Sequence, residues 1–457
     1  MSSIELNDRK TLVVGLGASG LAAAELCMAQ GARLTLNDSR DGGALEGALG
    51  ALATDDVERV LGGHPTQVFE EAELIVLSPG VPPLPALAAA RAAGVPIIGE
   101  LELGARFVEA PIVAITGTNG KSTTTSLCGA MLAEGGRPTF VGGNLGVPLC
   151  RAVLDDHPGL KPGGACVLEL SSFQLETVAR FHATVAMLLN LSEDHLDRYP
   201  DFDSYVEAKA RVFERQTMDD WAVVNADPDQ RRCQMIGSRS VAPLVTFRSE
   251  RSHSTGAWTD ADELCVRLPR GQVERYPRAA LRLPGRHNGQ NALAALLAAR
   301  LSGASPASCL AALEGFEGLP HRMQLCGERD EVRFYNDSKA TNVGSVVGSL
   351  SGFSTRVVLI AGGKDKGGDY APLRPMLEQV CRHLVLIGAA ADAMESALEG
   401  AAPISRAASM AEAVRRAAEL AEPGDAVVLS PACSSYDMYV DYIARGDDFA
   451  AAVAALP

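Results

Sequence analysis

The chain has 457 residues, about three times the ~150 residues of a typical domain, so it can form several cores with clefts between them. Its 41 Lys and Arg residues against 56 Asp and Glu residues give a formal net charge of -15 without a long basic run, which argues against nucleic acid as a partner. No apolar stretch reaches the ~18 residues that span a bilayer, and the polar start MSSIELNDRK carries no targeting signal. The ten cysteines are scattered without a C-x-x-C pair, which is typical of reduced thiols in a cytoplasmic protein.

The first part of the chain alternates predicted strands, in TLVVG, RLTLND, ELIVLS and VPIIGE, with Ala- and Leu-rich helical segments. Between the first strand and its helix lies GLGASG, with Gly15, Gly17 and Gly20 in G-x-G-x-x-G register, and Asp38 follows the next strand. Taken alone, this motif favours a dinucleotide, so an NAD-dependent oxidoreductase or a non-catalytic nucleotide sensor is one hypothesis. A UDP-sugar fits equally well, because any diphosphate on a helix N-terminus needs the same glycines.

The second part opens with the apolar run PIVAIT, which breaks into a glycine turn before a helix carrying Lys121, Ser122 and Thr123. Backbone N–H groups of such a turn bind phosphate oxygens, a lysine neutralises the terminal phosphates, and a hydroxyl can ligate magnesium. The spacing departs from G-x-x-x-x-G-K-[ST], since Ile115 stands where the first glycine would be and Gly117 comes two residues later. The turn predicts ATP or GTP chemistry, against the alternative of a glycine-rich turn without a catalytic role.

Polar residues follow the next strand-like runs. Glu169 ends ACVLELSS and His195 follows TVAMLLN, and because the carboxyl ends of parallel strands share one edge, both could meet Ser122 on one metal. A carboxylate in an apolar run is costly unless a cation or a donor satisfies it. His195 could equally be a packed, hydrogen-bonded histidine, and histidine is an unusual ligand for magnesium. Lys209, in SYVEAKARVF, reads locally as a lysine on a helix surface.

Residues 231–284 change to short alternating strands such as ELCVRLP, which predict an insertion or a small antiparallel sheet before the helical GRHNGQNALAALLAARLSG. The last part opens after GLPHR and has predicted strands in RVVLIAGG, HLVLIG and DAVVLS. Asp337, Lys339, Lys366 and Ser435 follow or flank its strand ends. This mixture of cationic and hydroxyl groups suits an anionic substrate, although each residue alone could belong to a solvated loop.

Seven segments, in order along the chain, resemble the Mur ligase family of peptidoglycan synthesis: GTNGKST, ELSSFQLE, NLSEDHLDRY, HNGQNALAA, LPHR, NDSKATN and SPACSS. The match covers nearly the whole chain and is closest to the branch that adds D-glutamate. It implies an α/β protein of three domains. Residues 1–104 would be a Rossmann-like domain for a UDP-sugar, 105–318 a central P-loop-type ATPase domain, and 319–457 a C-terminal Rossmann-like domain for the amino acid, the outer two having parallel sheets.

The resemblance also implies binding residues. UDP-N-acetylmuramoyl-L-alanine would be held by Gly17, Ala18, Ser19, Asp38, Ser39, Arg40, Ser78, Gly80 and Asn144. ATP would be held by Gly117, Thr118, Asn119, Gly120, Lys121, Ser122, Thr123, Asn288, Asn291, Arg322, Asp337 and Lys339. D-glutamate would contact Thr341, Lys366, Ser435 and Tyr442. Here GGKDKGG departs from the GGDGK form of the family, and Tyr442 stands where related enzymes can carry phenylalanine.

By the same resemblance, Ser122, Glu169, His195 and Lys209 would ligate two magnesium ions, with Lys209 carbamylated, which replaces the surface reading of this lysine. Lys121, His195 and Lys209 are the expected catalytic residues. The implied reaction transfers the γ-phosphoryl group of ATP to the alanyl carboxylate, and the amine of glutamate attacks the acyl phosphate. A monomer in the cytoplasm is expected, with no nucleic acid and no membrane as a partner.

The nearest alternative is another ligase of this family, with a different amino acid or a folyl substrate. The chain has no DNPR segment of the kind carried by the member that adds a diamino acid, and SPACSS favours glutamate. A pure binding module is disfavoured, because GTNGKST, Glu169 and His195 combine into a metal and phosphate constellation. The residues do not reveal the enantiomer of glutamate, since pocket chirality depends on backbone placement.

Overall fold

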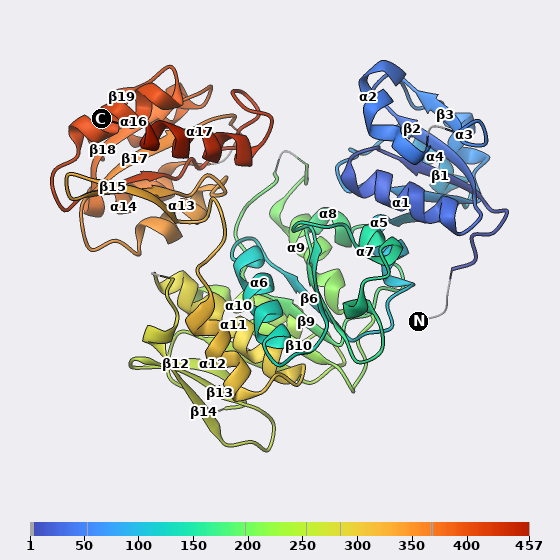
Figure 1. The fold of residues 1–457 in the computed structure, drawn as a ribbon, viewed down its shortest axis with the longest axis horizontal. Helices are drawn as coiled ribbons and strands as arrows, with labels where there is room; N and C mark the ends of the chain where they lie inside the picture. The colour runs from blue at the N-terminus through green and yellow to red at the C-terminus, as the bar shows by residue number, and fades with distance from the viewer. Residues whose placement is uncertain are drawn as a thin grey trace.

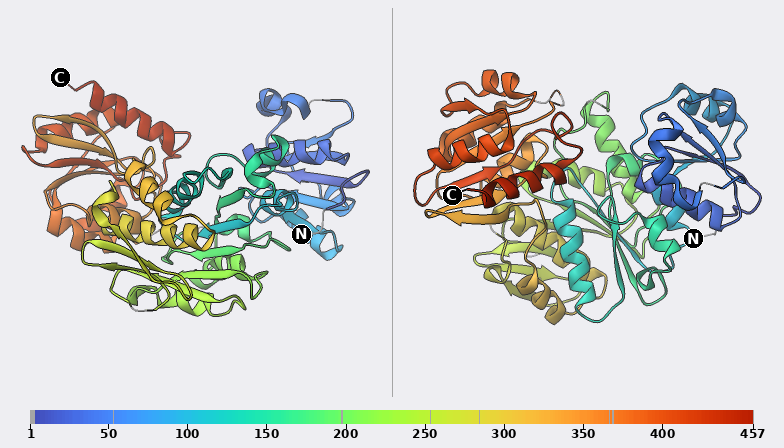
Figure 2. Two further views of the ribbon diagram at one scale, coloured as in Figure 1. Left: turned by 60° about the horizontal axis from the view of Figure 1, so that its bottom comes forward. Right: turned by 45° about the horizontal axis from the view of Figure 1, so that its top comes forward.

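The computed structural model describes residues 4–52, 54–196, 198–252, 254–283, 285–365, 367 and 369–456. Three β-sheets follow one another along the chain and form three lobes, with the central lobe between the other two (Figure 1). The views in Figure 2 show the same order, with the N-terminal and the C-terminal lobes on opposite flanks of the central one. The predicted α/β architecture of three units is confirmed.

The N-terminal sheet has five parallel strands in the order β3-β2-β1-β4-β5. Its strands are β1 (Lys10–Val14), β2 (Arg33–Asp38), β3 (Glu58–Leu61), β4 (Leu74–Leu77) and β5 (Ile97–Gly99). Its helices are α1 (Ala18–Ala29), α2 (Gly42–Leu49), α3 (Thr66–Glu70), α4 (Pro85–Ala92) and α5 (Glu100–Ala105), with the 3-10 turn η1 (Gly50–Leu52). The strand order reverses between β1 and β4, and ligands bind beyond the carboxyl ends of strands at such a switch point.

The central sheet has nine strands in the order β14-β13-β12-β11-β10-β9-β6-β8-β7. The strands are β6 (Ile112–Thr116), β7 (Thr139–Gly143), β8 (Ala165–Glu169), β9 (Val185–Leu188), β10 (Trp221–Asn225), β11 (Leu244–Arg248), β12 (Gly256–Asp260), β13 (Glu263–Arg267) and β14 (Val273–Pro277). Pairing is parallel from β7 to β12 and antiparallel from β12 to β14. The small antiparallel sheet expected within residues 231–284 is therefore an extension of the central sheet.

The connections of the central lobe are helices and short 3-10 turns. They are α6 (Lys121–Ala133), α7 (Leu149–Leu154), η2 (Pro158–Leu160), α8 (Ser172–Leu175), α9 (Phe202–Ala210), η3 (Arg211–Phe213), η4 (Pro228–Gln230), α10 (Arg231–Gly237), η5 (Arg278–Ala280), α11 (Arg286–Leu301) and α12 (Pro306–Gly315). Residues 292–299 of α11 are all buried, and α11 packs against α6 and the strands of the antiparallel extension. The small side chains of this alanine-rich sequence allow α11 to pack closely on α6. This contact holds α6, the helix that begins at the glycine turn, in place.

The C-terminal sheet has six strands in the order β15-β16-β20-β17-β18-β19. The strands are β15 (Gln324–Arg329), β16 (Val332–Asn336), β17 (Val357–Gly362), β18 (Cys381–Ile387), β19 (Ile404–Arg406) and β20 (Ala426–Leu429). The helices are α13 (Val343–Leu350), α14 (Arg374–Val380), α15 (Ala391–Leu398), α16 (Met410–Leu420) and α17 (Tyr442–Ala454), with the 3-10 turn η6 (Ala371–Leu373). The expected parallel sheet carries one antiparallel edge strand, β15.

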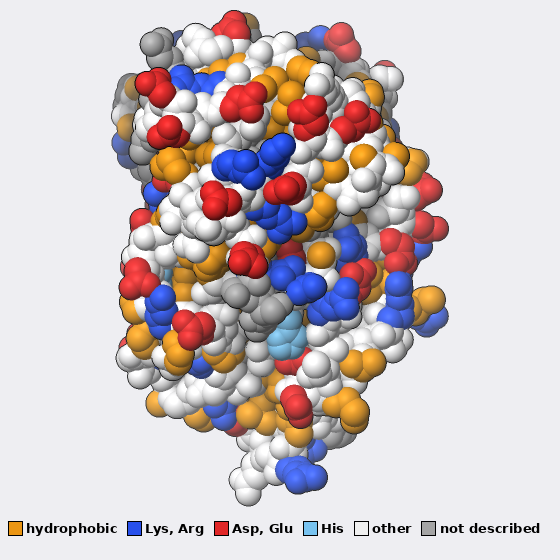
Figure 3. All heavy atoms as spheres, turned by 90° about the vertical axis from the view of Figure 1, so that its right-hand side faces the viewer, with side chains coloured by type: hydrophobic (Ala, Val, Ile, Leu, Met, Phe, Trp, Pro, Cys, Tyr) orange, Lys and Arg blue, Asp and Glu red, His pale blue; other side chains and the backbone are white. Residues whose placement is uncertain are grey.

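The distribution of charged side chains on the surface and the state of the cysteines agree with what the composition predicts. On the face shown in Figure 3, acidic and basic side chains are intermixed, and apolar ones form small groups. All ten cysteines are free, and nine are buried. Within the described part of the chain, none of the helices has the length and apolar character required to cross a membrane.

Candidate active site

A glycine turn between β6 and α6 forms the centre of the site. Gly117 has a φ of 149° and Gly120 a φ of 82°, values that L side chains rarely adopt. A Cβ on Gly120 would lie 2.2 Å from Asn291 Oδ1, and one on Gly117 would lie 2.9 Å from the Cβ of Leu189. The backbone therefore passes closely against α11 and the end of β9, and α6 begins directly after the turn. The positive end of this helix dipole faces the turn, which is the geometry of a phosphate loop.

Lys121 lies over the loop that it belongs to. Its Nζ donates hydrogen bonds to the carbonyl oxygens of Gly117 and Thr118, at 3.0 and 2.8 Å. The loop is also held from outside, because the backbone N of Asn119 donates to Asn190 Oδ1 at 2.8 Å. The structure thus places a cation on the phosphate loop, as the motif predicted.

Glu169, at the end of β8, lies next to the first turn of α6. Its carboxylate accepts hydrogen bonds from the hydroxyl of Ser122 and, at 2.7 Å, from Asn144 Nδ2. Only 2% of Glu169 is exposed. Burial raises the pKa of this carboxyl, but the charges of Lys121 and Arg322 and the hydrogen bonds from Ser122 and Asn144 together lower it below its usual value. The group is therefore an ionised carboxylate in a buried position.

These donors fit a magnesium ion bound together with nucleotide phosphates. A hydroxyl beside an ionised carboxylate at a phosphate loop supplies the oxygen ligands that magnesium prefers, and phosphate and water complete such a shell. Within the described ranges there is no cluster of three or more His, Cys, Asp and Glu side chains that could hold a metal by itself. The structure brings Ser122 and Glu169 into contact, whereas His195 takes no part in the hydrogen bond between them.

Lys209 is buried, with 1% exposure, so its local reading as a lysine on a helix surface was wrong. Its Nζ donates to the carbonyl oxygen of Gly117 at 2.8 Å and lies 4.7 Å from the ring centroid of Tyr205. Burial, followed by the charge of Lys121, lowers the pKa of Lys209 well below its usual value. The ring of His195 lies 6.3 Å from the same tyrosine and 4.8 Å from Phe173. Lys209 and His195 are thus both neighbours of Tyr205.

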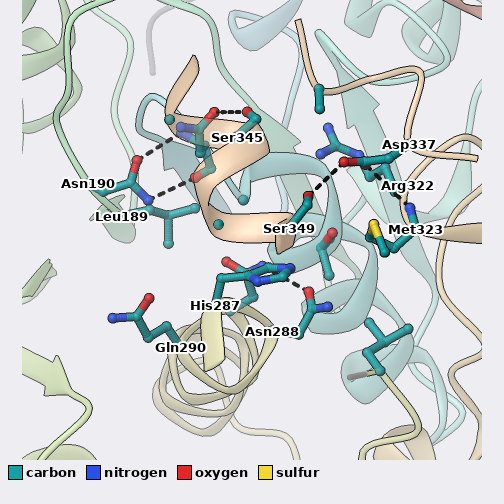
Figure 4. A pocket seen from close by; sticks show the side chains of 18 of the residues that line it. Leu189, Asn190, His287, Asn288, Gln290, Arg322, Met323, Asp337, Ser345 and Ser349 are labelled. Carbon is teal, nitrogen blue, oxygen red and sulfur yellow. Dashed lines mark hydrogen bonds between the residues drawn. The ribbon is translucent and has the colours of Figure 1, made fainter. Parts of the chain in front are cut away.

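A cleft of about 850 Å³ opens between the central and the C-terminal lobes, beside the phosphate loop. Asn288 of α11 lines it from one side, and Arg322 and Asp337 from the other (Figure 4), and Asn291 of α11 belongs to the same lining. Burial raises the pKa of Asp337 to about 6, and the hydroxyls of Ser349 and Ser430, at 2.6 and 2.8 Å, donate to Oδ2 of this carboxyl. The cleft suits a nucleotide whose phosphates reach the loop.

A second cleft, of about 1780 Å³, receives residues from all three lobes. Gly80 comes from the N-terminal lobe and His195 from the central lobe, and Lys339, Thr341, Ser435 and Tyr442 come from the C-terminal lobe. Lys339 Nζ lies 3.7 Å from the ring centroid of Tyr442. Burial, together with the charge of Arg322, lowers the pKa of Lys339 to about 8.

Sequence reasoning missed several residues that line this second cleft, among them Phe173, Arg198 and Lys364. Lys364 lies just beyond β17, after Gly363 in GGKDKGG, and this position after a strand end was the signal that could have found it. Lys366, which the sequence singled out instead, lies outside the described residues.

The glycine motif of the N-terminal lobe lies at the switch point between β1 and β4. Gly15 has a φ of 85°, and a Cβ on Gly20 would lie 1.7 Å from the Gly15 carbonyl oxygen, so both positions require glycine. Asp38 Oδ2 accepts from the backbone N of Leu16 at 2.7 Å and pairs with Arg40 at 2.7 Å. The hydrogen bond from Arg40 holds the pKa of Asp38 well below its usual range despite partial burial.

The remaining expected sugar-binding residues divide between two lobes. A Cβ on Gly15 would lie 3.0 Å from the Cβ of Ser78, which places Ser78 at the glycine motif. Gly17 caps α1, so Ala18 and Ser19 form its first turn. Asn144 lies in the central lobe, where its Nδ2 donates a hydrogen bond to the carboxylate of Glu169. The structure therefore brings the predicted residues to one edge of the N-terminal sheet, except Asn144.

A glycine turn with the geometry of a phosphate loop, beside a buried carboxylate and hydroxyl pair in an α/β protein of three lobes, is typical of a nucleotide-binding protein. Three family models match the chain: the MurD-like N-terminal domain of Mur ligases at residues 9–99, the Mur ligase middle domain at 115–299, and the Mur ligase glutamate ligase domain at 321–433. The chain belongs to the Mur ligase family.

Curated relatives match over the full length. The UDP-N-acetylmuramoylalanine–D-glutamate ligase of Pelobacter propionicus is 48% identical over 454 residues, covering 99% of this chain and 100% of its own. The protein of the same name from Anaeromyxobacter dehalogenans is 49% identical over 461 residues, covering 98% of each chain.

Solved structures agree on the fold. The MurF ligase of Thermotoga maritima, in complex with ADP, has a TM-score of 0.61 at 15% identity and covers 98% of this chain and 96% of its own. The UDP-N-acetylmuramate-alanine ligase MurC of the same organism has a TM-score of 0.58 at 19% identity and covers 98% of this chain and 99% of its own.

Proposed function

We propose that this protein is an ATP-dependent ligase that joins D-glutamate to UDP-N-acetylmuramoyl-L-alanine during the synthesis of peptidoglycan precursors. The observation that carries the proposal is the combination of a phosphate loop, which lines the cleft between the central and C-terminal lobes, with a second cleft that receives residues from all three lobes. Full-length relatives of this name support the choice of substrates. The dinucleotide reading of GLGASG loses its support, because the N-terminal family model that covers it is that of Mur ligases.

In this proposal the boundaries of the three domains lie near residues 104 and 318. The first domain holds the UDP-sugar on Gly17, Ala18, Ser19, Asp38, Ser39, Arg40, Ser78 and Gly80, with Asn144 contributed by the second. ATP lies in the cleft lined by Asn288, Asn291, Arg322 and Asp337. D-glutamate enters between Thr341, Ser435 and Tyr442, which line the second cleft beside Lys364. Lys366 is the further candidate for this ligand.

Ser122, Glu169, His195 and a carbamylated Lys209 would hold two magnesium ions. The ions supply positive charge to the phosphoryl group as it is transferred. Burial of Lys209 beside the carbonyl oxygen of Gly117 supports the modification, because carbamylation converts a buried cation into an oxygen ligand. Lys121 already lies over the loop, where it would neutralise the terminal phosphate of ATP.

Residues of this chain account for the two successive steps of the reaction. Lys121 and the N-terminus of α6 orient the γ-phosphoryl group toward the alanyl carboxylate, and an acyl phosphate and ADP form. Residues of the second cleft hold glutamate so that its amine attacks the acyl carbon, and phosphate leaves from the tetrahedral adduct. Closure of the three lobes excludes water, which would otherwise hydrolyse the acyl phosphate. The protein would work as a monomer in the cytoplasm, without nucleic acid or membrane as a partner.

The test is phosphate release from Mg-ATP by the purified protein given UDP-N-acetylmuramoyl-L-alanine, with D-glutamate, L-glutamate or no amino acid, together with the mass of the product. Release with a mass gain of one glutamate, only with D-glutamate, is expected. A gain with L-glutamate alone would change the substrate, and an absence of release that depends on the UDP-sugar would contradict the proposal.

A further inference from the structure

The amide side chain of Asn342 contacts three elements at once. Asn342 is the N-cap of α13, where its Oδ1 accepts a hydrogen bond of 2.8 Å from the backbone N of Ser345. Its Nδ2 donates to Asn119 Oδ1 of the phosphate loop at 3.1 Å and to Asp194 Oδ2, in the loop after β9, at 3.2 Å. One side chain therefore joins the C-terminal lobe to two loops of the central lobe.

The contact around Asn342 is close-packed. The hydroxyl of Ser345 donates to the same Asn119 Oδ1 at 2.7 Å, and Figure 4 shows Ser345 at the edge of the nucleotide cleft. A Cβ on Gly344 would lie 3.3 Å from Asn119 Nδ2 and 3.5 Å from Ser192 Oγ. The first turn of α13 thus lies directly against the phosphate loop.

Asn342 also lies between the two clefts along the chain. Thr341, the residue before it, lines the cleft shared by the three lobes, and Gly344 and Ser345, just after it, line the nucleotide cleft. A movement of α13 away from the loop would change both clefts together. The hydrogen bonds of Asn342 therefore hold the segment that connects the walls of the two clefts.

We propose that Asn342 is a positioning residue that latches the C-terminal lobe onto the phosphate loop, so that the two clefts stay in register while the acyl phosphate exists. This inference rests on the proposed function. Asn342 acts through Asn119 and Asp194. A lobe that is not latched admits water and leaves the attacking amine misplaced, so loss of the latch lowers kcat and releases phosphate without product.

Two variants separate this latch from the helix cap. Asn342→Ser keeps a capping oxygen but is too short to donate across the interface, and Asn342→Asp keeps the cap, loses the donor and places a carboxylate near Asp194. Because two hydrogen bonds are lost, kcat is expected to fall about tenfold in Asn342→Ser and further in Asn342→Asp. The ratio of phosphate released to product formed should rise in both, with the midpoint of thermal unfolding near that of the wild type.

Ser409→Ala is the matched control. Ser409 caps α16 by accepting from the backbone N of Glu412 at 3.2 Å, in the same lobe and outside both clefts. This variant should lower the thermal midpoint and leave kcat and the ratio of phosphate to product unchanged. If it uncouples the reaction as Asn342→Asp does, or if both Asn342 variants behave like the wild type, the latch is overturned.

A second measurement does not depend on turnover. Small-angle X-ray scattering with Mg-ADP should give a larger radius of gyration for Asn342→Asp than for the wild type, because the C-terminal lobe is released. If the wild type forms no product with either glutamate, the proposed function fails, and the scattering still decides the latch: equal radii overturn it.

Discussion

Arg322 Nη2 donates a hydrogen bond of 2.7 Å to Ser122 Oγ, across 200 residues of sequence. Arg322 begins the C-terminal part of the chain, and Ser122 lies in the first turn of α6. The same hydroxyl bonds to the carboxylate of Glu169. Arg322 therefore brings a cation from the C-terminal lobe to the point where the phosphates and a magnesium ion would meet, so this point needs both lobes for its charge balance.

Lys121→Ala tests the phosphate loop. The variant loses the cation that lies over Gly117 and Thr118, and with it the charge that would offset the terminal phosphate of ATP. We expect kcat to fall by about a thousandfold, which release of phosphate in the presence of all substrates will measure. Lys161→Ala is the control, because Lys161 is a half-exposed lysine paired with Asp156. A Lys121→Ala protein with the turnover of the wild type would contradict the assignment of this turn as a phosphate loop.

Lys209→Ala tests the proposed carbamate. Removal of this buried side chain should abolish turnover, and a short carboxylic acid should restore part of it by entering the space and supplying an oxygen ligand. Under native, non-acidic conditions the wild-type protein should show the added mass of one CO2, which the variant lacks. Lys121→Ala with the same acid is the control, since its missing group is a cation. Equal recovery in both variants would contradict a specific role for an oxygen at position 209.

Parallel strands, the glycine turns and the order of the lobes could be predicted, because hydrophobic runs and turn residues are local signals. The short strands β3, β7, β15 and β19 were not predicted, since three to six residues with polar or glycine positions carry a weak pattern. The burial of Lys209 was also hidden. Its neighbours Glu207 and Arg211 make the sequence around it polar, while Gly117 of the phosphate loop, whose carbonyl oxygen accepts from Lys209, lies 92 residues earlier.

The spacing of motifs along the chain does not predict contacts between lobes. The amide of Asn342 meets Asn119 across 223 residues, and nothing in NDSKATN distinguishes a helix cap from a cap that also bonds to another lobe. The motif could identify the segment as functional. Only the packing of α13 on the phosphate loop assigns that asparagine a partner.

Glu100→Gln tests a buried acid between the N-terminal and central lobes. Glu100 Oε1 accepts from the backbone N of Cys150 at 2.7 Å, and its Oε2 has no hydrogen-bond partner among the described residues. Burial raises the pKa of this carboxyl from 4.5 to about 7. Between these values the folded protein binds a proton that the unfolded chain has lost, so this group's contribution to stability falls as the pH rises from about 4.5 to about 7.

The Glu100→Gln variant should therefore be more stable than the wild type at pH 8, by up to about 3 kcal/mol in the free energy of unfolding, and the difference should vanish near pH 4.5. Urea unfolding at a series of pH values measures it. Glu102→Gln is the control. The Glu102 carboxylate accepts from the backbone N of Ala179 and of Phe181 at 2.9 Å and pairs with Arg106, so this change should destabilise the protein by about 3 kcal/mol at pH 8. A Glu100→Gln protein with the pH dependence of the wild type would refute the account.

Tyr442→Phe and Tyr442→Ala separate the ring of Tyr442 from its hydroxyl. Lys339 Nζ lies 3.7 Å from the ring centroid, so the ring holds this lysine at the wall of the second cleft by a cation–π contact. Phenylalanine keeps that contact, and kcat/KM for D-glutamate should stay within about twofold of the wild type. Alanine removes it, and the loss of about 1 to 2 kcal/mol for a partly desolvated pair should lower kcat/KM about tenfold. Steady-state kinetics with glutamate as the varied substrate will measure both. Because the two variants share the loss of the hydroxyl and differ in the ring, an equal fall in both would assign the contact to the hydroxyl.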